Sequence, residues 1–271
     1  MLKVLLTFVS IALTSSALSA GQVDTMRIFS TSMQKDIGCL VVRPDSYSDT
    51  AESYPVVYLL HGYSGNFTGW VKEAPQLLQL VDLYQILIVC PDGGYDSWYL
   101  DSPADSTVRY ETHIVREVIS YIDSNYNTRR ARTGRAIAGL SMGGHGALYL
   151  AARNPEVFGA AGSMAGGLDL RPFPKNWNMK RVLGDFETYR ENWEQHSVVN
   201  LVPKFKTADI KLIIDCGTSD FFLEVNRDMH KRLLEAGIPH EYTERPGGHT
   251  GSYWGSAVDY QLLFFSKAFQ N

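Results

Sequence analysis

The sequence predicts an α/β fold in which helices cover both faces of a mostly parallel central sheet. Short, continuously apolar runs are typical of strands that are buried on both faces. They alternate with longer segments in which apolar residues recur every three or four positions, as helices that cross over a sheet require. With 271 residues, of which 45% are hydrophobic and 20% charged, the chain can bury the core that such a sheet needs.

The individual elements follow in chain order. Residues 26–32 and 38–43 predict an opening antiparallel pair of strands. Buried strands are expected at 56–60, 86–90, 136–140 and 212–216, and a final strand at 241–244. Helices are expected at 74–83, 113–122, 144–153 and 223–236, with a closing helix at 256–269.

Residues 1–20 have the pattern of a secretory signal. Lys3 supplies a positive charge, residues 4–13 an apolar stretch, and the small residues that follow a cleavage region. An uncleaved membrane anchor is the alternative, but no cluster of charges follows to stop transfer. We therefore expect a single mature domain over 21–271 that is secreted or periplasmic. Stable membrane insertion after cleavage is not expected, because no later run reaches the roughly 18 apolar residues of a span.

Charge and cysteine usage narrow the class of partners. The net charge is −4 and the lysine and arginine residues are scattered, which argues against a nucleic-acid partner. The three cysteines, Cys39, Cys90 and Cys216, cannot all pair within one chain. They lie in or beside apolar runs, which favours buried free thiols, although a disulfide between two of them stays open. They also lack the spacing of metal ligands, so no metal is expected. No other cofactor is expected either.

Residues 166–209 interrupt the alternation of strands and helices. The segment holds Pro172, Pro174, Trp177 and Trp193 but no clean strand pattern. A stretch of this length in a compact domain is often a lid or a binding loop. We predict a lid, with the two tryptophans as candidate lid residues. A pair of packed surface helices is the alternative.

A Gly-x-Ser-x-Gly pattern runs from Gly139 through Ser141 to Gly143. It follows the expected strand 136–140 and precedes the expected helix 144–153. In this setting a serine stands on a sharp strand-to-helix turn with its hydroxyl exposed. A Cβ at either glycine would collide with a neighbouring element. A plain glycine-rich turn is the alternative, but the context favours Ser141 as a nucleophile.

A serine hydroxyl needs a base to accept its proton, and the base needs an acid to orient it. In this kind of fold the acid follows a late strand and the histidine follows the last strand. Asp220 and His249 occupy these positions, so the predicted catalytic residues are Ser141, Asp220 and His249. Asp215 ranks lower, because inside a strand its side chain would point into a face of the sheet. Glu224, the other competing carboxylate, is expected one turn into the helix that follows Asp220.

Acyl transfer also needs N–H donors for the oxyanion that develops on the substrate. The residue after the nucleophile, Met142, provides one such donor through its backbone. The second is expected from the loop at 61–65, where the backbone N–H of Tyr63 is our candidate. A tight turn without a catalytic role is the alternative interpretation of this loop.

Several motifs together carry a family resemblance. They are Leu-His-Gly-Tyr-Ser-Gly at 60–65, Pro-Asp-Gly at 91–93, Ser-Trp-Tyr at 97–99, Gly-Leu-Ser-Met-Gly-Gly at 139–144, Cys-Gly-Thr-Ser-Asp at 216–220, Gly-His-Thr at 248–250 and Tyr-Trp at 253–254. This set resembles the esterase D group of α/β-hydrolases and spans nearly the whole mature chain. That group includes tributyrin, feruloyl and cinnamoyl esterases, S-formylglutathione hydrolases and mycolyltransferases. The resemblance implies a metal-independent serine hydrolase that acts on esters of short or aromatic acids.

The substrate is less constrained than the reaction. Trp98, Tyr99, Phe221 and Phe222 lie beside the expected site loops and form either an aromatic acyl pocket or ordinary core. An exported protein does not meet a glutathione thioester, which belongs to the cytosol. The favoured hypothesis is a secreted carboxylesterase that releases short or hydroxycinnamoyl groups, with a small ester or an acylated plant polysaccharide as substrate. A polysaccharide acetyl esterase, an acyltransferase with the same triad and a non-catalytic binding module are the alternatives.

Overall fold

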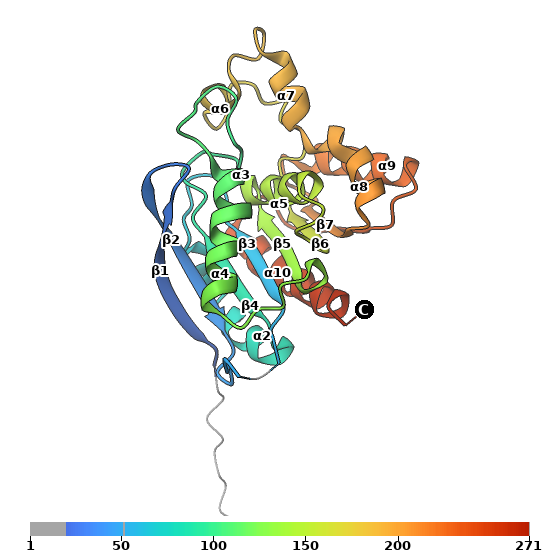
Figure 1. Cartoon of the computed structure of the whole chain (residues 1–271). Helices are drawn as coiled ribbons and strands as arrows, with labels where there is room; N and C mark the ends of the chain where they lie inside the picture. The colour runs from blue at the N-terminus through green and yellow to red at the C-terminus, as the bar shows by residue number, and fades with distance from the viewer. Residues whose placement is uncertain (1–19, 51, 271) are drawn as a thin grey trace, which may run out of the picture.

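The structure, a computed structural model, describes residues 20–50 and 52–270. The strands in this part of the chain are β1 (Gln22–Ser30), β2 (Lys35–Arg43), β3 (Val56–Leu60), β4 (Leu87–Pro91), β5 (Arg135–Leu140), β6 (Ala160–Met164), β7 (Lys211–Gly217) and β8 (Glu241–Arg245). Among the described residues they form one eight-stranded sheet in the order β1-β2-β4-β3-β5-β6-β7-β8 (Figure 1). The predicted signal segment, residues 1–20, lies outside the described residues except for its last position.

The pairing of the strands confirms the predicted α/β class with a mostly parallel sheet. β2 pairs with β1 and with β4 in antiparallel fashion, whereas the pairs from β4 through β8 are all parallel. Every residue of β3, β4, β5 and β6 is buried, as strands covered on both faces must be. The carboxyl ends of these parallel strands meet at one edge of the sheet, and the loops that leave this edge hold the candidate site.

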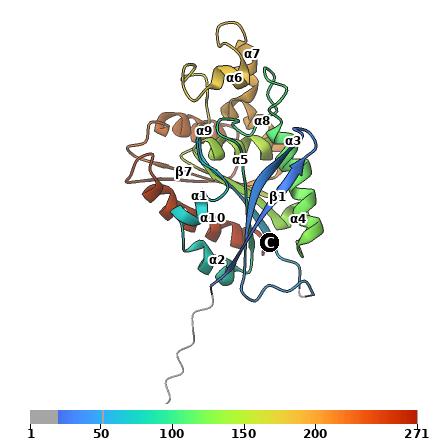
Figure 2. The same ribbon diagram turned by 90° about the vertical axis from the view of Figure 1, so that its left-hand side faces the viewer.

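Two hydrophobic clusters fill the two faces of the sheet. The helices on one face are α1 (Gly69–Glu73), α2 (Leu77–Tyr84) and α10 (Gly251–Ala268). The helices on the other face are α4 (Ile119–Asn125), α5 (Met142–Arg153), α8 (Val202–Ala208) and α9 (Leu223–Glu235). Figure 2 shows α2 and α10 on one side of the sheet and α4 on the other. The sequence-based expectation of helices on both faces is therefore confirmed.

Several elements differ from the sequence-based expectation; β1, for example, is expected at 26–32 and spans Gln22–Ser30. β6 was not expected, because its sequence Ala-Ala-Gly-Ser-Met lacks the β-branched and aromatic residues that are typical of strands. The helix expected at 113–122 is longer: α3 (Tyr110–Thr112) continues through a π-helical turn, His113–Val118, into α4. α10 begins at Gly251, earlier than expected, since Thr250 caps it by accepting a hydrogen bond from the N–H of Tyr253.

The segment 166–209 consists mainly of short helices. They are α6 (Met179–Leu183), α7 (Arg190–His196), a 3₁₀ turn at Val198–Leu201 and α8. α6 and α7 lie at the top of both views, beyond the body of the sheet (Figures 1 and 2).

The described part of the chain holds no helix that combines the length and the hydropathy of a membrane crossing. Its three cysteines, Cys39, Cys90 and Cys216, are buried and unpaired. Burial raises the pKa of each of these thiols. Among the described residues, no cluster of histidine, cysteine, aspartate or glutamate side chains is arranged to hold a metal ion.

Candidate active site

Ser141 stands at the turn between β5 and α5 in a strained backbone conformation. Its φ is 54° and its ψ −116°, a region that non-glycine residues rarely adopt. The residue is 8% exposed. The N–H of Ser141 donates to the carbonyl of Met164 in β6, and the carbonyl of Ser141 accepts from the N–H of His145 in α5. Strand and helix thus hold the turn from both sides and aim the hydroxyl away from the sheet.

Close backbone contacts explain the glycines that flank this turn. A Cβ on Gly139 would collide with the backbone of Gly143. A Cβ on Gly143 would stand 2.7 Å from the carbonyl oxygen of His61, at the start of the neighbouring loop. The Gly-x-Ser-x-Gly pattern therefore allows three pieces of backbone to converge beneath the serine.

The structure brings Ser141, Asp220 and His249 into one chain of hydrogen bonds. The distance from His249 Nε2 to Ser141 Oγ is 2.8 Å. His249 Nδ1 lies 2.8 Å from Asp220 Oδ2. Because a carboxylate only accepts, Nδ1 carries the hydrogen and Nε2 is free to accept the serine proton. The side chain of Asp220 is fully buried, and its other oxygen accepts a hydrogen bond of 2.8 Å from the N–H of Phe222.

Asp215, the competing carboxylate, lies elsewhere. It sits within β7 and accepts hydrogen bonds from the Tyr253 hydroxyl at 2.9 Å and from Gln261 Nε2 at 2.8 Å, both on α10. Arg245 Nη2 approaches it at 3.1 Å. Burial raises its pKa to about 6. This carboxylate joins β7 to α10 and β8 and makes no contact with His249.

The two candidate oxyanion donors lie on facing segments, Met142 at the elbow and Tyr63 on the loop after β3. Met142 is the first residue of α5, so its N–H lies outside the hydrogen-bond ladder of the helix. Tyr63 lies on the facing loop, and His61 holds the backbone of this loop in place. His61 Nε2 accepts a hydrogen bond of 2.8 Å from the N–H of Gly93, and His61 Nδ1 donates one of 2.8 Å to the carbonyl of Gly62. Ser64 N–H donates to the carbonyl of Tyr95 at 2.8 Å, which ties this loop to the one that follows β4.

A cavity of about 200 Å³ opens above Ser141 and His249. Phe221 and Trp177 line it, and Trp70, Glu73 and Trp254 complete the wall near α1 and α10. The Phe221 ring lies 4.2 Å from the His249 ring. Of the four aromatic residues that were candidates for the acyl pocket, Phe221 is thus the one that reaches the cavity.

Tyr99 is fully buried, where its hydroxyl donates to the carbonyl of His61, and Trp98 and Phe222 lie behind this wall. Each is 1% exposed, and neither lines the cavity. Both rings pack against Trp177, at centroid distances of 5.8 Å and 5.1 Å. They therefore support the wall from the core. The sequence could not show this, because a position beside a site loop does not determine the direction of a side chain. Trp193, the other candidate lid residue, is fully buried and packs against Phe186.

Sequence reasoning missed Trp70 and Glu73 as cavity residues. Trp70 is buried and its Nε1 donates to the carbonyl of Leu60 at 3.0 Å, which joins α1 to the end of β3. Partial burial raises the pKa of the Glu73 carboxyl. No local pattern marks either residue, although both follow shortly after the candidate oxyanion loop. Trp254 belongs to a motif that carried the resemblance, and its ring meets the edge of His249 at 4.8 Å.

A larger cavity lies away from these residues. It measures about 440 Å³ and lies at the start of β7 and β8, beside Lys211 and Glu241. In parallel sheets, ligands bind outside the carboxyl ends of the strands, whereas this cavity lies at the amino ends. The smaller cavity above Ser141 is therefore the candidate substrate site.

His145, on α5 beneath the elbow, is a buried base with a predictable effect on stability. Its Nε2 donates to the carbonyl of His196 at 2.8 Å. Burial lowers its pKa from 6.5 to about 4. The unfolded chain therefore binds more protons than the native protein between these values, so stability rises with pH across this window.

We expect this imidazole to lower the free energy of unfolding by about 2 kcal/mol when the pH falls from 7 to 5. Urea unfolding at the two pH values measures the change. His145→Gln keeps an amide donor but no titrating group, so its loss between pH 7 and 5 should be smaller by about that amount. Identical pH dependence in the variant and the parent would contradict the assignment.

A mostly parallel sheet with a serine at a strand-to-helix elbow and a histidine after the last strand defines an α/β-hydrolase. The model of the Esterase family matches residues 30–265. The chain therefore belongs to the Esterase family, a family of carboxylic-ester hydrolases, and the resemblance to the esterase D group is confirmed.

Individual relatives agree with this membership. The chain is similar to an esterase of Mycobacterium tuberculosis (strain CDC 1551 / Oshkosh), with 34% identity over 240 residues that cover 78% of this chain and 52% of the relative. It thus spans about half the length of that relative. An acetyl esterase of Caldicellulosiruptor saccharolyticus is 26% identical over 261 residues, which cover 89% of this chain and 97% of the relative. The solved structure of a ferulic acid esterase superposes with a TM-score of 0.78 at 27% identity, covering 92% of this chain and 99% of that one.

Proposed function

We propose that the protein is a secreted serine carboxylesterase that forms an acyl-enzyme on Ser141. The observation that carries the proposal is the hydrogen-bond chain from Ser141 through His249 to Asp220, with distances of 2.8 Å at each step. In this proposal Ser141 is the nucleophile, His249 the base and Asp220 its orienting acid. Membership of the Esterase family supports the reaction class.

The proposed reaction has two halves. Ser141 Oγ attacks the ester carbonyl carbon while His249 Nε2 takes the hydroxyl proton, and the tetrahedral intermediate places its oxyanion between the N–H groups of Met142 and Tyr63. Collapse expels the alcohol, which receives the proton from Nε2. Water then attacks the acyl carbon, gives a proton to Nε2, and releases the acid as Oγ regains that proton.

The α5 helix contributes to the electrostatics of these steps. Its amino end, at Met142, lies at the proposed oxyanion position, where the helix dipole favours negative charge. His249 becomes positively charged in the intermediate, and the buried Asp220 carboxylate balances that charge.

The proposed substrates are esters of short or hydroxycinnamoyl acids, including acyl groups on plant polysaccharide. The aromatic wall made by Phe221 and Trp177 suits a planar acyl group, which it contacts by stacking and area burial. The likeness to a ferulic acid esterase supports the hydroxycinnamoyl ester, and the likeness to an acetyl esterase supports the acetyl ester as the second candidate. Cleavage of residues 1–20 and a secreted or periplasmic location belong to the same proposal, on the signal pattern of the sequence.

A substrate panel tests this proposal. Methyl ferulate, acetylated xylan and p-nitrophenyl acetate are assayed with the mature chain, with and without a sugar acceptor. We expect turnover of methyl ferulate with free ferulic acid as the product. Fast acetate release without ferulate turnover would move the assignment to a polysaccharide acetyl esterase, and acyl transfer to the sugar would make the protein an acyltransferase.

Truncating Phe221 tests the acyl wall. Because an aromatic contact is worth on the order of 1 kcal/mol, Phe221→Ala should lower kcat/KM for methyl ferulate several-fold. The loss should be smaller for p-nitrophenyl acetate, since a two-carbon acyl group reaches little of the wall. Phe29→Ala is the matched control: Phe29 is 54% exposed, against 53% for Phe221, but lies on β1. Equal losses on both substrates would contradict the role of Phe221 in acyl recognition.

A further inference from the structure

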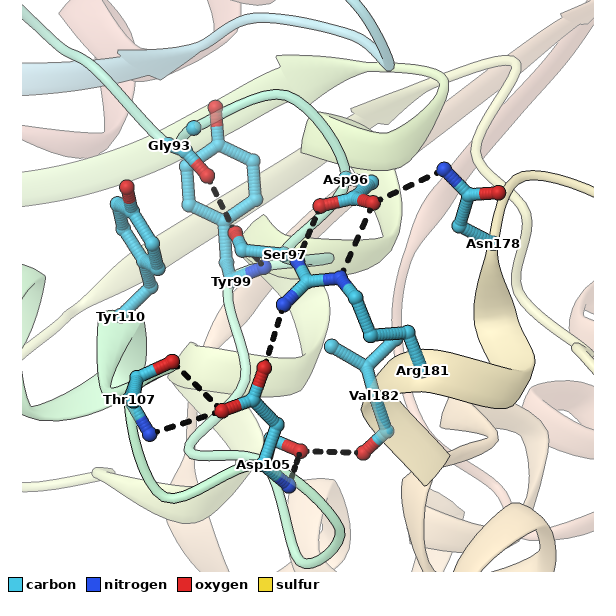
Figure 3. Close-up of polar contacts among 12 residues, drawn as sticks. Gly93, Asp96, Ser97, Tyr99, Asp105, Thr107, Tyr110, Asn178, Arg181 and Val182 are labelled. Atoms are coloured by element: carbon cyan, nitrogen blue, oxygen red, sulfur yellow. Dashed lines mark hydrogen bonds and ion pairs between the residues drawn. The ribbon is translucent and has the colours of Figure 1, made fainter. Parts of the chain in front are cut away.

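Arg181 links the segment 166–209 to the loop that follows β4. It lies in α6, and its guanidinium meets two carboxylates of residues 92–109, here called the β4 loop (Figure 3). Arg181 Nη1 lies 2.6 Å from Asp105 Oδ2, while Nη2 pairs with Asp96 Oδ1 and Nε lies 3.3 Å from Asp96 Oδ2. The Asp96 side chain is 11% exposed and the Arg181 side chain 43%, so the carboxylate is shielded from water while the guanidinium stays partly accessible.

Further hydrogen bonds join the same two segments. Asn178 Nδ2 donates to Asp96 Oδ2 at 3.1 Å, and the Ser102 hydroxyl donates to the carbonyl of Val182 at 2.6 Å. Figure 3 shows Asp96 and Asp105 of the β4 loop facing Asn178 and Arg181 at α6. The contacts therefore fix the position of α6 relative to the sheet.

The β4 loop has its own internal supports. Asp105 Oδ1 accepts from the N–H and the hydroxyl of Thr107, at 3.0 Å and 2.6 Å. These bonds and Arg181 hold the pKa of Asp105 below its ordinary value, so the carboxylate is charged at neutral pH. Ser97 donates to the carbonyl of Gly93 across the same loop. A rigid loop gives Arg181 fixed partners.

Trp177 is the residue whose position this bridge controls. Trp177 and Asn178 directly precede α6, and both have left-handed backbone conformations, with φ of 49° and 53°. Such conformations cost about 1 kcal/mol or more for residues with a Cβ, and they persist only where the surroundings impose them. The Trp177 ring stacks on Phe221 at 5.8 Å and 22° and lines the cavity above Ser141.

The same loop also supports the candidate oxyanion loop. Tyr95, next to Asp96, accepts from the N–H of Ser64 at 2.8 Å. The Tyr95 ring lies 5.0 Å from the ring of Tyr63. One short stretch of the β4 loop thus contacts both the oxyanion loop and the segment that carries Trp177. It therefore holds these two walls of the cavity in fixed positions relative to each other.

We propose that Arg181 is a positioning residue that, through Asp96 and Asp105, holds Trp177 over Ser141 and so determines the preference of the enzyme for large acyl groups. This inference rests on the proposed function in taking Ser141 as the reacting residue. Arg181 does not touch the cavity itself, and it acts through the backbone of α6 on the ring of Trp177. A purely structural ion pair would instead affect all substrates alike.

Two p-nitrophenyl esters with the same leaving group separate these outcomes. For Arg181→Ala we expect kcat/KM for p-nitrophenyl benzoate to fall about tenfold, mainly through KM, which corresponds to about 1.4 kcal/mol. The value for p-nitrophenyl acetate should change less than about twofold. Arg181→Lys should recover part of the loss, because an ammonium keeps one ion pair but not the fork that spans both carboxylates.

Arg171→Ala is the matched control. Arg171 also forms a double ion pair, with Asp169 and Glu194, but all three residues lie within the segment 166–209. This variant should leave the ratio of the two esters unchanged. In a Trp177→Ala background, Arg181→Ala should add no further discrimination. Equal losses on both esters, the same effect from Arg171→Ala, or full additivity with Trp177→Ala would overturn the proposal.

Hydrogen exchange of the peptide that carries Trp177 provides a readout independent of turnover. We expect faster exchange there in Arg181→Ala than in the parent or in Arg171→Ala. Unchanged exchange would also overturn the role of Arg181. If the parent hydrolysed no ester, the proposed function would fail, while the exchange data would still decide whether Arg181 holds Trp177 in place.

Discussion

Ser141→Ala is expected to lower kcat for ester hydrolysis by roughly 10⁴-fold or more, with the protein still folded. The variant loses the hydroxyl that lies 2.8 Å from His249 Nε2, so the proposed covalent intermediate cannot form. Residual activity would come from substrate binding and from the proposed oxyanion donors alone. Steady-state kinetics with p-nitrophenyl acetate measures the loss, and a urea unfolding curve verifies the fold.

Ser163→Ala is the matched control for this variant. Ser163 is a fully buried serine in β6, and its hydroxyl has no hydrogen-bond partner among the described residues. Removing that hydroxyl should leave kcat within a few-fold of the parent. A Ser141→Ala variant with nearly parental turnover would exclude Ser141 as the nucleophile.

Asp220→Asn is expected to lower kcat by roughly 10⁴-fold with little change in KM. In the parent, His249 Nδ1 lies 2.8 Å from a carboxylate oxygen of Asp220. The amide of the variant has the same size but presents an N–H donor toward Nδ1. The imidazole then carries its hydrogen on Nε2 and cannot accept the proton of Ser141. Steady-state kinetics on both p-nitrophenyl esters separates kcat from KM.

Asp215→Asn provides the comparison that discriminates between the two carboxylates. Asp215 binds Tyr253, Gln261 and Arg245 and makes no contact with His249, so its variant should lose stability and keep most of its kcat. A folded, inactive Asp215→Asn together with an active Asp220→Asn would reverse the assignment.

The parts of the fold and site that could be predicted from the sequence are those set by local stereochemistry and chain order. β3 and β4 are continuous apolar runs, β7 is one apart from Lys211 and Asp215, and the elbow at Ser141 needs glycines where backbones converge. The order serine, acid, histidine follows from the order of the strands, so the three side chains could be named before the contacts were known. Their catalytic roles are proposals that the variants above test.

The parts that could not be predicted depend on contacts between distant segments. β6 is made of small residues and becomes a strand because its neighbours β5 and β7 pair with it. Trp98 and Phe221 both follow site loops, yet only packing decides that one is buried and the other exposed. α6 has only five residues, too few for a periodic pattern, and long-range pairs such as Arg181 with Asp96 determine its position.

Labelling with a fluorophosphonate, followed by mass spectrometry of the intact protein and of its peptides, tests the acyl-enzyme on Ser141 most directly. The probe phosphonylates an activated serine and so reports the nucleophile without requiring knowledge of the substrate. We predict one adduct per chain, located on Ser141, and no adduct in Ser141→Ala. An adduct on another residue, or labelling that survives in Ser141→Ala, would contradict the proposed mechanism.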